Sequence, residues 1–225
     1  LNHPNIVKFY CAVLYPVTII VTEYASKGSL YEHLKSQLRL PVEKMLEWSR
    51  QATLAVQHLQ KNNVVHRDIK SSNFVINAHD VLKLCDFGLA KTQCWTVATT
   101  KERGTIRWMA PEAYVEKVSS KSSDVFSLGI VIWELVTCDL PYAGKEDLCV
   151  LYAVKVHKLR PEIPAHCPVA LKHLLGKCWK ENRKKRPSID AVLRTIDAVI
   201  EKRLLYQCSG KLCTNTLYLI PHLLC

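Results

Sequence analysis

The chain has 225 residues, of which 48% are hydrophobic and 23% charged, and it carries a formal net charge of +11. This is the composition of an ordinary globular protein, with room for one or two domains large enough for a buried core. No apolar run is long enough to cross a membrane, and none of the ten cysteines forms a C-x-x-C pair, so reduced cytosolic thiols fit better than a secreted disulfide framework. The densest basic run, residues 183–186, is short and lacks interleaved aromatic residues, which argues against nucleic-acid binding.

The first part of the chain predicts two strands and the start of a helix. Residues 6–10 and 17–22 are rich in β-branched and aromatic residues, with a turn expected between them. Residues 23–28 lose this apolar pattern, as a linker would. Ser29 and Glu32 have the spacing of a capping box, which opens a short helix.

The next part predicts a helix followed by short strands. Residues 42–59 place apolar side chains at helical spacing. Short strands are expected at 64–65, 74–76 and 82–84, and residues 77–80 should form the turn between the last two.

Residues 65–73, Val-His-Arg-Asp-Ile-Lys-Ser-Ser-Asn, match the catalytic-loop pattern H-R-D-L-x-x-x-N, with isoleucine in place of the leucine. Asp68 can accept a proton, and Asn73, five residues later, offers a carbonyl ligand to a hard cation. Lys70 lies between them and can meet phosphate charge. Asp86, which begins an Asp-Phe-Gly triplet, supplies a second ligand for a hard cation.

The remainder of the chain predicts a loop and then several helices. Residues 92–103 are polar and aperiodic, so a mobile loop is expected, and residues 110–112 then read Ala-Pro-Glu. Residues 124–137 are apolar almost all round, which indicates a centrally buried helix. Three more helices are expected at 148–154, 169–179 and 189–200, the last with Ser188 as its N-cap. From about residue 206 the helical pattern breaks, and residues 217–220 could pair as a strand or be disordered.

Because these motifs occur in one order with plausible gaps, the chain resembles the eukaryotic protein kinase catalytic domain over residues 1–204. The resemblance implies an α+β fold, mainly the helical large lobe with the last strands and the hinge of the small lobe. Its parts would be a small-lobe remnant (1–22), the hinge (23–28), the large lobe (29–204) and a tail of unknown structure (205–225). No Gly-rich phosphate loop or strand lysine precedes the first strand, so we expect an N-terminally truncated kinase domain.

The resemblance also implies ATP and Mg²⁺ as cofactors and assigns roles to individual residues. Asp68 would accept or orient the proton of the substrate hydroxyl, and Lys70 would stabilise the transferred phosphoryl group. Asn73 and Asp86 would hold Mg²⁺. The positions implied to bind ATP are Thr22 before the hinge, Glu23 and Ala25 in the hinge, Val75 under the adenine ring, and Asp86.

A second group of residues is implied to support or regulate the site. Glu112 and Arg186 resemble a buried ion pair that anchors the activation segment, and Asp124 resembles the helix carboxylate that caps the catalytic loop. The positive charge of Arg67 would be neutralised by a phosphate on the activation loop, as kinases with this arginine often need. The candidate phosphoacceptors are Thr96, Thr99 and Thr100, each of which could equally be a solvated loop threonine. Thr105 would contact Asp68 and Lys70.

The substrate class follows from details of these motifs. Lys70 with residues 104–105 resembles serine/threonine kinases, whereas Cys178-Trp179 ahead of Arg186 resembles the tyrosine-kinase-like branch. Taken together, the motifs are similar to mixed-lineage kinases, which implies a cytoplasmic MAP kinase kinase kinase acting on a downstream MAP kinase kinase. Two alternatives remain open, a catalytically inactive kinase-like binding module and a tyrosine kinase.

Overall fold

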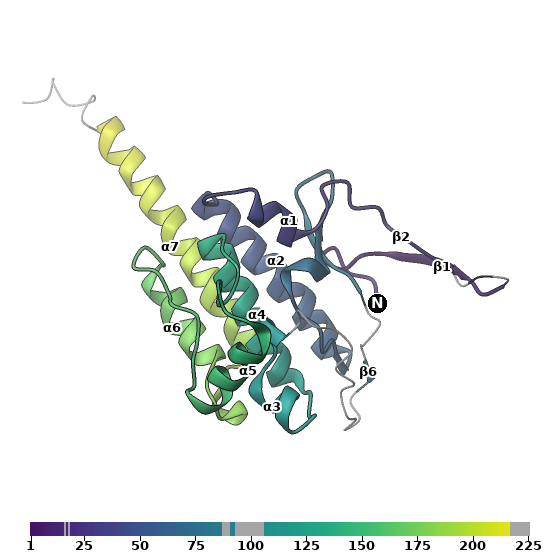
Figure 1. The fold of residues 1–225 in the computed structure, drawn as a ribbon. Helices are drawn as coiled ribbons and strands as arrows, with labels where there is room; N and C mark the ends of the chain where they lie inside the picture. Colours follow the sequence, from purple (N-terminus) through teal and green to yellow (C-terminus); the bar gives the residue numbers. More distant parts are fainter. Residues whose placement is uncertain (16, 18, 87–90, 93–105, 217–225) are drawn as a thin grey trace, which may run out of the picture.

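A helical body and a projecting β-hairpin make up the computed structural model, which describes residues 1–15, 17, 19–86, 91–92 and 106–216 (Figure 1). The fold is α+β, as predicted. The α-helices are α1 (Leu30–Lys35), α2 (Val42–Lys61), α3 (Pro111–Val115), α4 (Lys121–Thr137), α5 (Asp147–Val156), α6 (Val169–Cys178) and α7 (Ile189–Thr216). Three short 3₁₀ helices are η1 (Ser71–Asn73), η2 (Ile106–Trp108) and η3 (Arg183–Lys185).

The strands form three two-stranded antiparallel sheets, β1–β2, β3–β6 and β4–β5, within the described ranges. They are β1 (Phe9–Val13), β2 (Ile19–Thr22), β3 (Val64–Val65), β4 (Phe74–Ile76), β5 (Leu82–Leu84) and β6 (Lys91–Thr92). Thr92, predicted to begin a loop, is therefore the last residue of a strand, and the rest of the predicted 92–103 loop lies outside the described residues.

The first strand begins three residues later than predicted, because the residues before it pair elsewhere. Ile6 bridges to Leu84 and is only 2% exposed. The N–H of Val7 donates to the carbonyl of Leu84, and the N–H of Leu84 donates to the carbonyl of Asn5. Pairing with β5 therefore holds this stretch against the helical body, and the β1–β2 hairpin starts only beyond it.

Helix α4 is the centre of the helical body (Figure 1). Its N-cap Ser120 accepts a hydrogen bond from the N–H of Ser123, and nearly every residue from Ser123 to Val136 is buried. Helix α2 packs against both α4 and α7, and α6 also contacts α4 and α7. A helix that is apolar on all sides is stable only when other helices enclose it in this way, so the prediction of a central buried helix is confirmed.

Helix α7 is longer than predicted. Its first turn has the expected cap, since Ser188 Oγ accepts a hydrogen bond from the N–H of Ala191. The prediction that the helical pattern breaks near residue 206 is wrong, because α7 continues to Thr216 (Figure 1). Leu204 and Leu205, just before residue 206, are 54% and 70% exposed. Once the packed half has formed, each further residue that is fixed adds one hydrogen bond, and the costly nucleation step is not repeated.

None of the helices in the described ranges combines the length and the apolar composition that a membrane crossing requires.

Candidate functional site

The 65–73 loop, which follows β3, is fixed by a carboxylate from the central helix. Asp124 Oδ2 accepts a hydrogen bond of 2.8 Å from the N–H of His66, and its Oδ1 accepts one of 3.0 Å from the N–H of Arg67. Arg67 has a φ of 73°, a conformation that non-glycine residues rarely adopt. Burial raises the pKa of Asp124 to about 7, against the opposing effect of the two N–H groups and the Arg67 charge. The buried carboxyl thus holds an otherwise unfavourable backbone turn just before Asp68.

Asp68 is held by two side chains of its own loop. Its Oδ2 lies 2.9 Å from Lys70 Nζ and 2.9 Å from Asn73 Nδ2, and Asn73 Nδ2 also donates to the Asp68 carbonyl at 2.7 Å. Asp68 Oδ1 is buried and has no hydrogen-bond partner among the described residues. A buried polar atom usually finds a partner, so this oxygen is available to a group that the site binds.

Asn73 connects Asp68 to the segment that carries Asp86. The carbonyl of Asn73 accepts from the N–H of Cys85 at 2.8 Å and from its thiol at 3.2 Å. Burial raises the pKa of Cys85 to about 11, which keeps this thiol protonated as a donor. The amide nitrogen of Asn73 is used on Asp68, and among the described residues none donates a hydrogen bond to its Oδ1, which can therefore take a ligand. Asp86 follows with a φ of 58° and an exposed side chain, so the two predicted cation ligands are joined through one residue.

His66 is a site residue to which the sequence assigned no role. It is completely buried; its Nδ1 faces the N–H of Asp68 at 3.4 Å, and its Nε2 lies 3.1 Å from the carbonyl of Cys85. An N–H can only donate and a carbonyl can only accept, so the proton sits on Nε2. Burial lowers the pKa of His66, which favours this neutral form. A neutral imidazole thus ties the 65–73 loop to the strand that leads to Asp86.

The predicted hinge runs from β2 to the body beside β4. The N–H of Lys27 donates to the carbonyl of Ile76, and the N–H of Ile76 donates to the carbonyl of Gly28. Val75 lies half-buried on β4, while Thr22, the last residue of β2, is exposed. Within the described part of the chain, no hydrogen bond uses the N–H of Ala25 or the carbonyl of Glu23. These two backbone groups are therefore open to a planar ligand with a donor and an acceptor edge.

The Glu23 side chain fixes the start of this hinge. Its carboxylate lies 2.9 Å from Lys83 Nζ on β5 and also accepts from the N–H of Lys8. Burial alone would raise the pKa of Glu23, but the hydrogen bonds and charges of Lys83 and Lys8 lower it overall. The Glu23 carboxylate thus ties the hinge to β5, and its side chain is not placed to bind a ligand.

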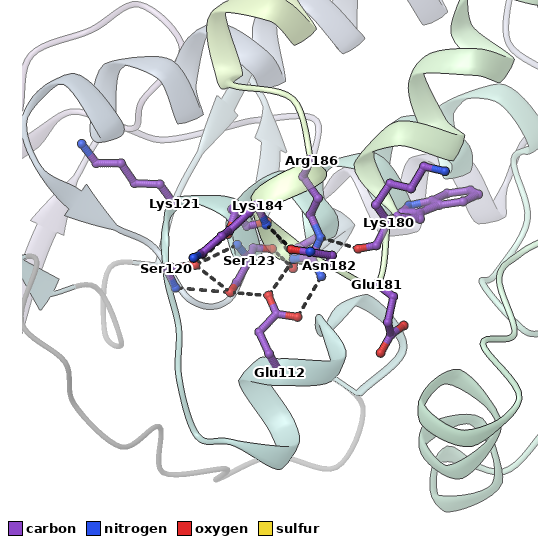
Figure 2. Close-up of polar contacts among 12 residues, drawn as sticks. Glu112, Ser120, Lys121, Ser123, Lys180, Glu181, Asn182, Lys184 and Arg186 are labelled. Atoms are coloured by element: carbon purple, nitrogen blue, oxygen red, sulfur yellow. Dashed lines mark hydrogen bonds and ion pairs between the residues drawn. The ribbon is translucent and has the colours of Figure 1, made fainter.

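Glu112 and Arg186, seventy-four residues apart, form a buried ion pair (Figure 2). Arg186 Nη1 and Nη2 donate to the two Glu112 oxygens at 2.6 and 2.8 Å, and Ser123 Oγ donates to Glu112 at 2.9 Å. The remaining Arg186 donors reach the carbonyls of Lys180 and Ser122. Burial opposes the charge of Glu112, but Arg186 lowers its pKa overall. The pair anchors α3 to the segment before α7.

Arg107 is a second residue that the sequence reading missed. It donates to the carbonyls of Pro141, Tyr142 and Lys145, and its Nε lies 2.9 Å from Asp147. These contacts fix η2 against the start of α5. The predicted residues Thr96, Thr99, Thr100 and Thr105 lie outside the described residues.

Comparisons with known proteins show which family this chain resembles. Residues 1–196 match the family model for "Protein tyrosine and serine/threonine kinase". The chain is 38% identical to the serine/threonine/tyrosine-protein kinase HT1 of Arabidopsis thaliana, over 99% of this chain and 59% of that protein. It is 36% identical to the serine/threonine-protein kinase STY17 of Arabidopsis thaliana (89% of this chain, 36% of that protein) and 37% identical to the mitogen-activated protein kinase kinase kinase 10 of Mus musculus (92% and 23%).

The chain therefore spans only part of the length of these curated relatives, at most 59% among the three. The match nevertheless covers most of the 225 residues and includes the 65–73 loop, Asp86, Glu112 and Arg186. The chain belongs to the protein tyrosine and serine/threonine kinase family.

Proposed function

We propose that this chain is the catalytic part of an ATP-dependent serine/threonine protein kinase. The observation that carries the proposal is the state of Asp68. Lys70 and Asn73 hold one of its carboxylate oxygens, while the other is buried and has no partner among the described residues. A fixed carboxylate with one open oxygen is the arrangement needed to take a proton from a substrate hydroxyl.

The surrounding residues fit the ATP and Mg²⁺ that such a reaction requires. ATP with Mg²⁺ would supply the phosphoryl group and neutralise its charge. Asn73 Oδ1 and the Asp86 carboxylate are hard oxygen ligands of the kind that Mg²⁺ prefers. The open backbone groups of Glu23 and Ala25, together with Val75, would hold the adenine. Lys70 would place positive charge between Asp68 and the transferred group.

The substrate class and the place in a signalling cascade are also proposed. Lys70 in the 65–73 loop favours serine and threonine hydroxyls over tyrosine. The similarity to a mitogen-activated protein kinase kinase kinase supports the narrower proposal that the protein substrate is a MAP kinase kinase. A cytoplasmic location would fit that role.

Replacement of Asp68 by asparagine tests the proposal. Asp68→Asn keeps the size of the side chain but removes the proton acceptor, so phosphorylation of a Ser/Thr substrate should fall at least ~10²-fold. The assay should use the longest natural form of the protein that contains these 225 residues. Asp80→Asn is the matched control, since the Asp80 side chain makes an exposed ion pair with Lys27 and the loss of that pair should leave the rate within about twofold. An Asp68→Asn rate within a few-fold of wild type would refute the assignment.

A second candidate function, a kinase-like binding module without catalysis, is supported by a different observation. The 225 residues contain no G-x-G-x-x-G segment, and the β1–β2 hairpin exposes large apolar side chains, with Phe9 58% and Ile20 66% exposed. Much of the charge stabilisation in phosphoryl transfer comes from a phosphate-covering loop and its lysine. An exposed apolar face of this kind also favours association with another protein.

Expression of residues 1–225 alone tests whether these residues suffice for catalysis. We expect weak ATP binding, no detectable phosphoryl transfer and poor solubility from this polypeptide, because its sequence contains no G-x-G-x-x-G loop to cover the phosphates. Turnover that disappears in Asp86→Ala would instead make these residues sufficient for catalysis and would remove the basis of the binding-module alternative.

A further inference from the structure

Two histidines, His3 and His58, lie against each other where the start of the chain meets α2. Their ring centroids are 4.8 Å apart, and the ring planes are inclined by 30°. His58 belongs to the last turn of α2, and both side chains are half-buried. The proposed function gives neither residue a role. The pair is nevertheless the place where the segment before β1 is fastened to the helical body.

The hydrogen bond of His3 requires a neutral ring. His3 Nδ1 accepts a hydrogen bond of 3.1 Å from the N–H of Asn5. An imidazole nitrogen accepts only while it carries no proton, so the single proton of this ring sits on Nε2. A protonated ring would carry N–H groups on both nitrogens. It would lose the bond to Asn5 and would turn one donor towards another.

The charges around His3 also oppose its protonation. His58 faces it from α2 and Lys83 from β5, and the charge of Lys83 is itself paired with Glu23. Burial, followed by the effects of His58 and Lys83, lowers the pKa of His3 below its ordinary value of 6.5. A base with a lowered pKa in the folded state stabilises the fold fully above that ordinary value, and the contribution is lost as the pH falls below it.

Asn5 passes the state of His3 on to β5. Asn5 is 5% exposed, its Nδ2 donates to the carbonyl of Leu82 at 3.0 Å, and its carbonyl accepts from the N–H of Leu84 at 2.8 Å. Strand β5 ends at Leu84, two residues before Asp86, the predicted Mg²⁺ ligand. The turn from His3 to Asn5 therefore holds in place the strand that leads to this ligand.

We propose that His3 and His58 form a pH-sensitive histidine pair that, when neutral, fixes residues 3–7 on β5 and α2, and that releases this segment from β5 when it is protonated in mild acid. Its effect on phosphorylation, through β5 and Asp86, rests on the proposed function. The release of the segment does not.

Hydrogen exchange of backbone amides, followed by mass spectrometry on the longest natural form of the protein, measures the release without any need for activity. Protection factors at pH 7.5 and 5.5 remove the intrinsic pH dependence of exchange. The amides of Val7 and Leu84, which bond across to each other's segments, should lose about three- to tenfold in protection at pH 5.5, as expected for the loss of about one hydrogen bond. Protection in α4 should not fall.

His3→Asn is the decisive variant. An asparagine side chain can accept from the N–H two residues ahead, as His3 does, but it does not titrate. Protection in residues 5–8 and 82–85 should therefore stay the same at both pH values. His58→Phe keeps a stacked ring and removes one of the two facing charges, so it should reduce the loss of protection.

His79→Asn is the matched control. His79 is an exposed histidine in the turn between β4 and β5, so its replacement removes a titrating ring next to the same strand and should leave the wild-type pH dependence unchanged. The proposal is overturned if wild-type protection does not fall, if His3→Asn keeps the full pH dependence, or if His79→Asn abolishes it equally.

Phosphorylation rates of the same proteins extend the test to catalysis. Wild type and His3→Asn share every other titrating group, so the ratio of their rates isolates the histidine pair. This ratio should be near one at pH 7.5 and should fall about three- to tenfold at pH 5.5. A ratio that does not change with pH would overturn the link from the pair to Asp86. Exchange that depends on pH as expected, without phosphoryl transfer at any pH, would support the pair and reject the proposed enzyme.

Discussion

Removal of the Arg186 side chain should destabilise the protein more than the loss of any exposed ion pair. Arg186→Ala leaves the 7%-exposed Glu112 side chain without its bidentate partner and also frees the carbonyls of Lys180 and Ser122. Breaking a buried pair by deleting one partner costs about 3–5 kcal/mol, since the remaining charge is buried without compensation. For a chain of this size each kcal/mol shifts Tm by about 2–4 °C, so Tm should fall by roughly 6–20 °C.

Urea denaturation followed by tryptophan fluorescence measures this difference, with Arg203→Ala as the control. Arg203 pairs with Glu43 at 2.7 Å, but the two side chains are 42% and 60% exposed. An exposed pair contributes about 0–1 kcal/mol. If the two variants lose the same small amount of unfolding free energy, the buried pair does not anchor α3.

The pH dependence of Arg186→Ala offers a second check on the same reasoning. Arg186 lowers the pKa of Glu112 below its ordinary value of 4.5 against the opposing effect of burial. The pair therefore stabilises the folded state above about pH 4.5, and this contribution is lost as the pH falls through the lower folded pKa. The difference in unfolding free energy between wild type and Arg186→Ala should shrink in acid. A difference that stays constant down to the lowest pH at which the protein folds would contradict the pair as its source.

Two further predictions concern α4. A Cβ at Gly129 would lie 2.8 Å from Trp179 Nε1 and 2.9 Å from Cys178 Cβ. Gly129→Ala should therefore lower the unfolding free energy by about 1–3 kcal/mol, whereas Gly176→Ala, where a Cβ meets open space, should not. Equal Tm values for the two variants would contradict the close packing around Gly129. Burial raises the pKa of Glu134 from 4.5 to about 8, so the folded state retains a proton that the unfolded state has lost, and stability should fall as the pH rises across this window. Glu134→Gln should flatten that slope in denaturation experiments from pH 5 to 8.5, and an unchanged slope would show that Glu134 is not its source.

The sequence by itself determined the local secondary-structure elements and the residues that would carry the chemistry. Capping residues such as Ser29 and Ser188 mark helix starts through bonds to nearby N–H groups, and helix α4 is recognisable because its apolar residues cover all sides. The order of Asp68, Asn73 and Asp86 was equally readable, since the chemistry needs those residue types at those intervals. The family follows from these motifs alone.

Only the tertiary structure decided which distant groups meet. The partners of Ser71 and Trp108 could not be read from the chain, because Glu134 lies 63 and 26 residues away and looks like any polar residue of an apolar helix. Ile6 was predicted as part of the 6–10 strand, but it bridges to Leu84 of β5 instead, and the β1–β2 hairpin begins only at Phe9. Propensity acts over a few residues, whereas burial and hydrogen bonding between distant segments depend on the whole fold. The open oxygen of Asp68 and the buried carboxylate of Glu134 were therefore visible only once the chain was folded.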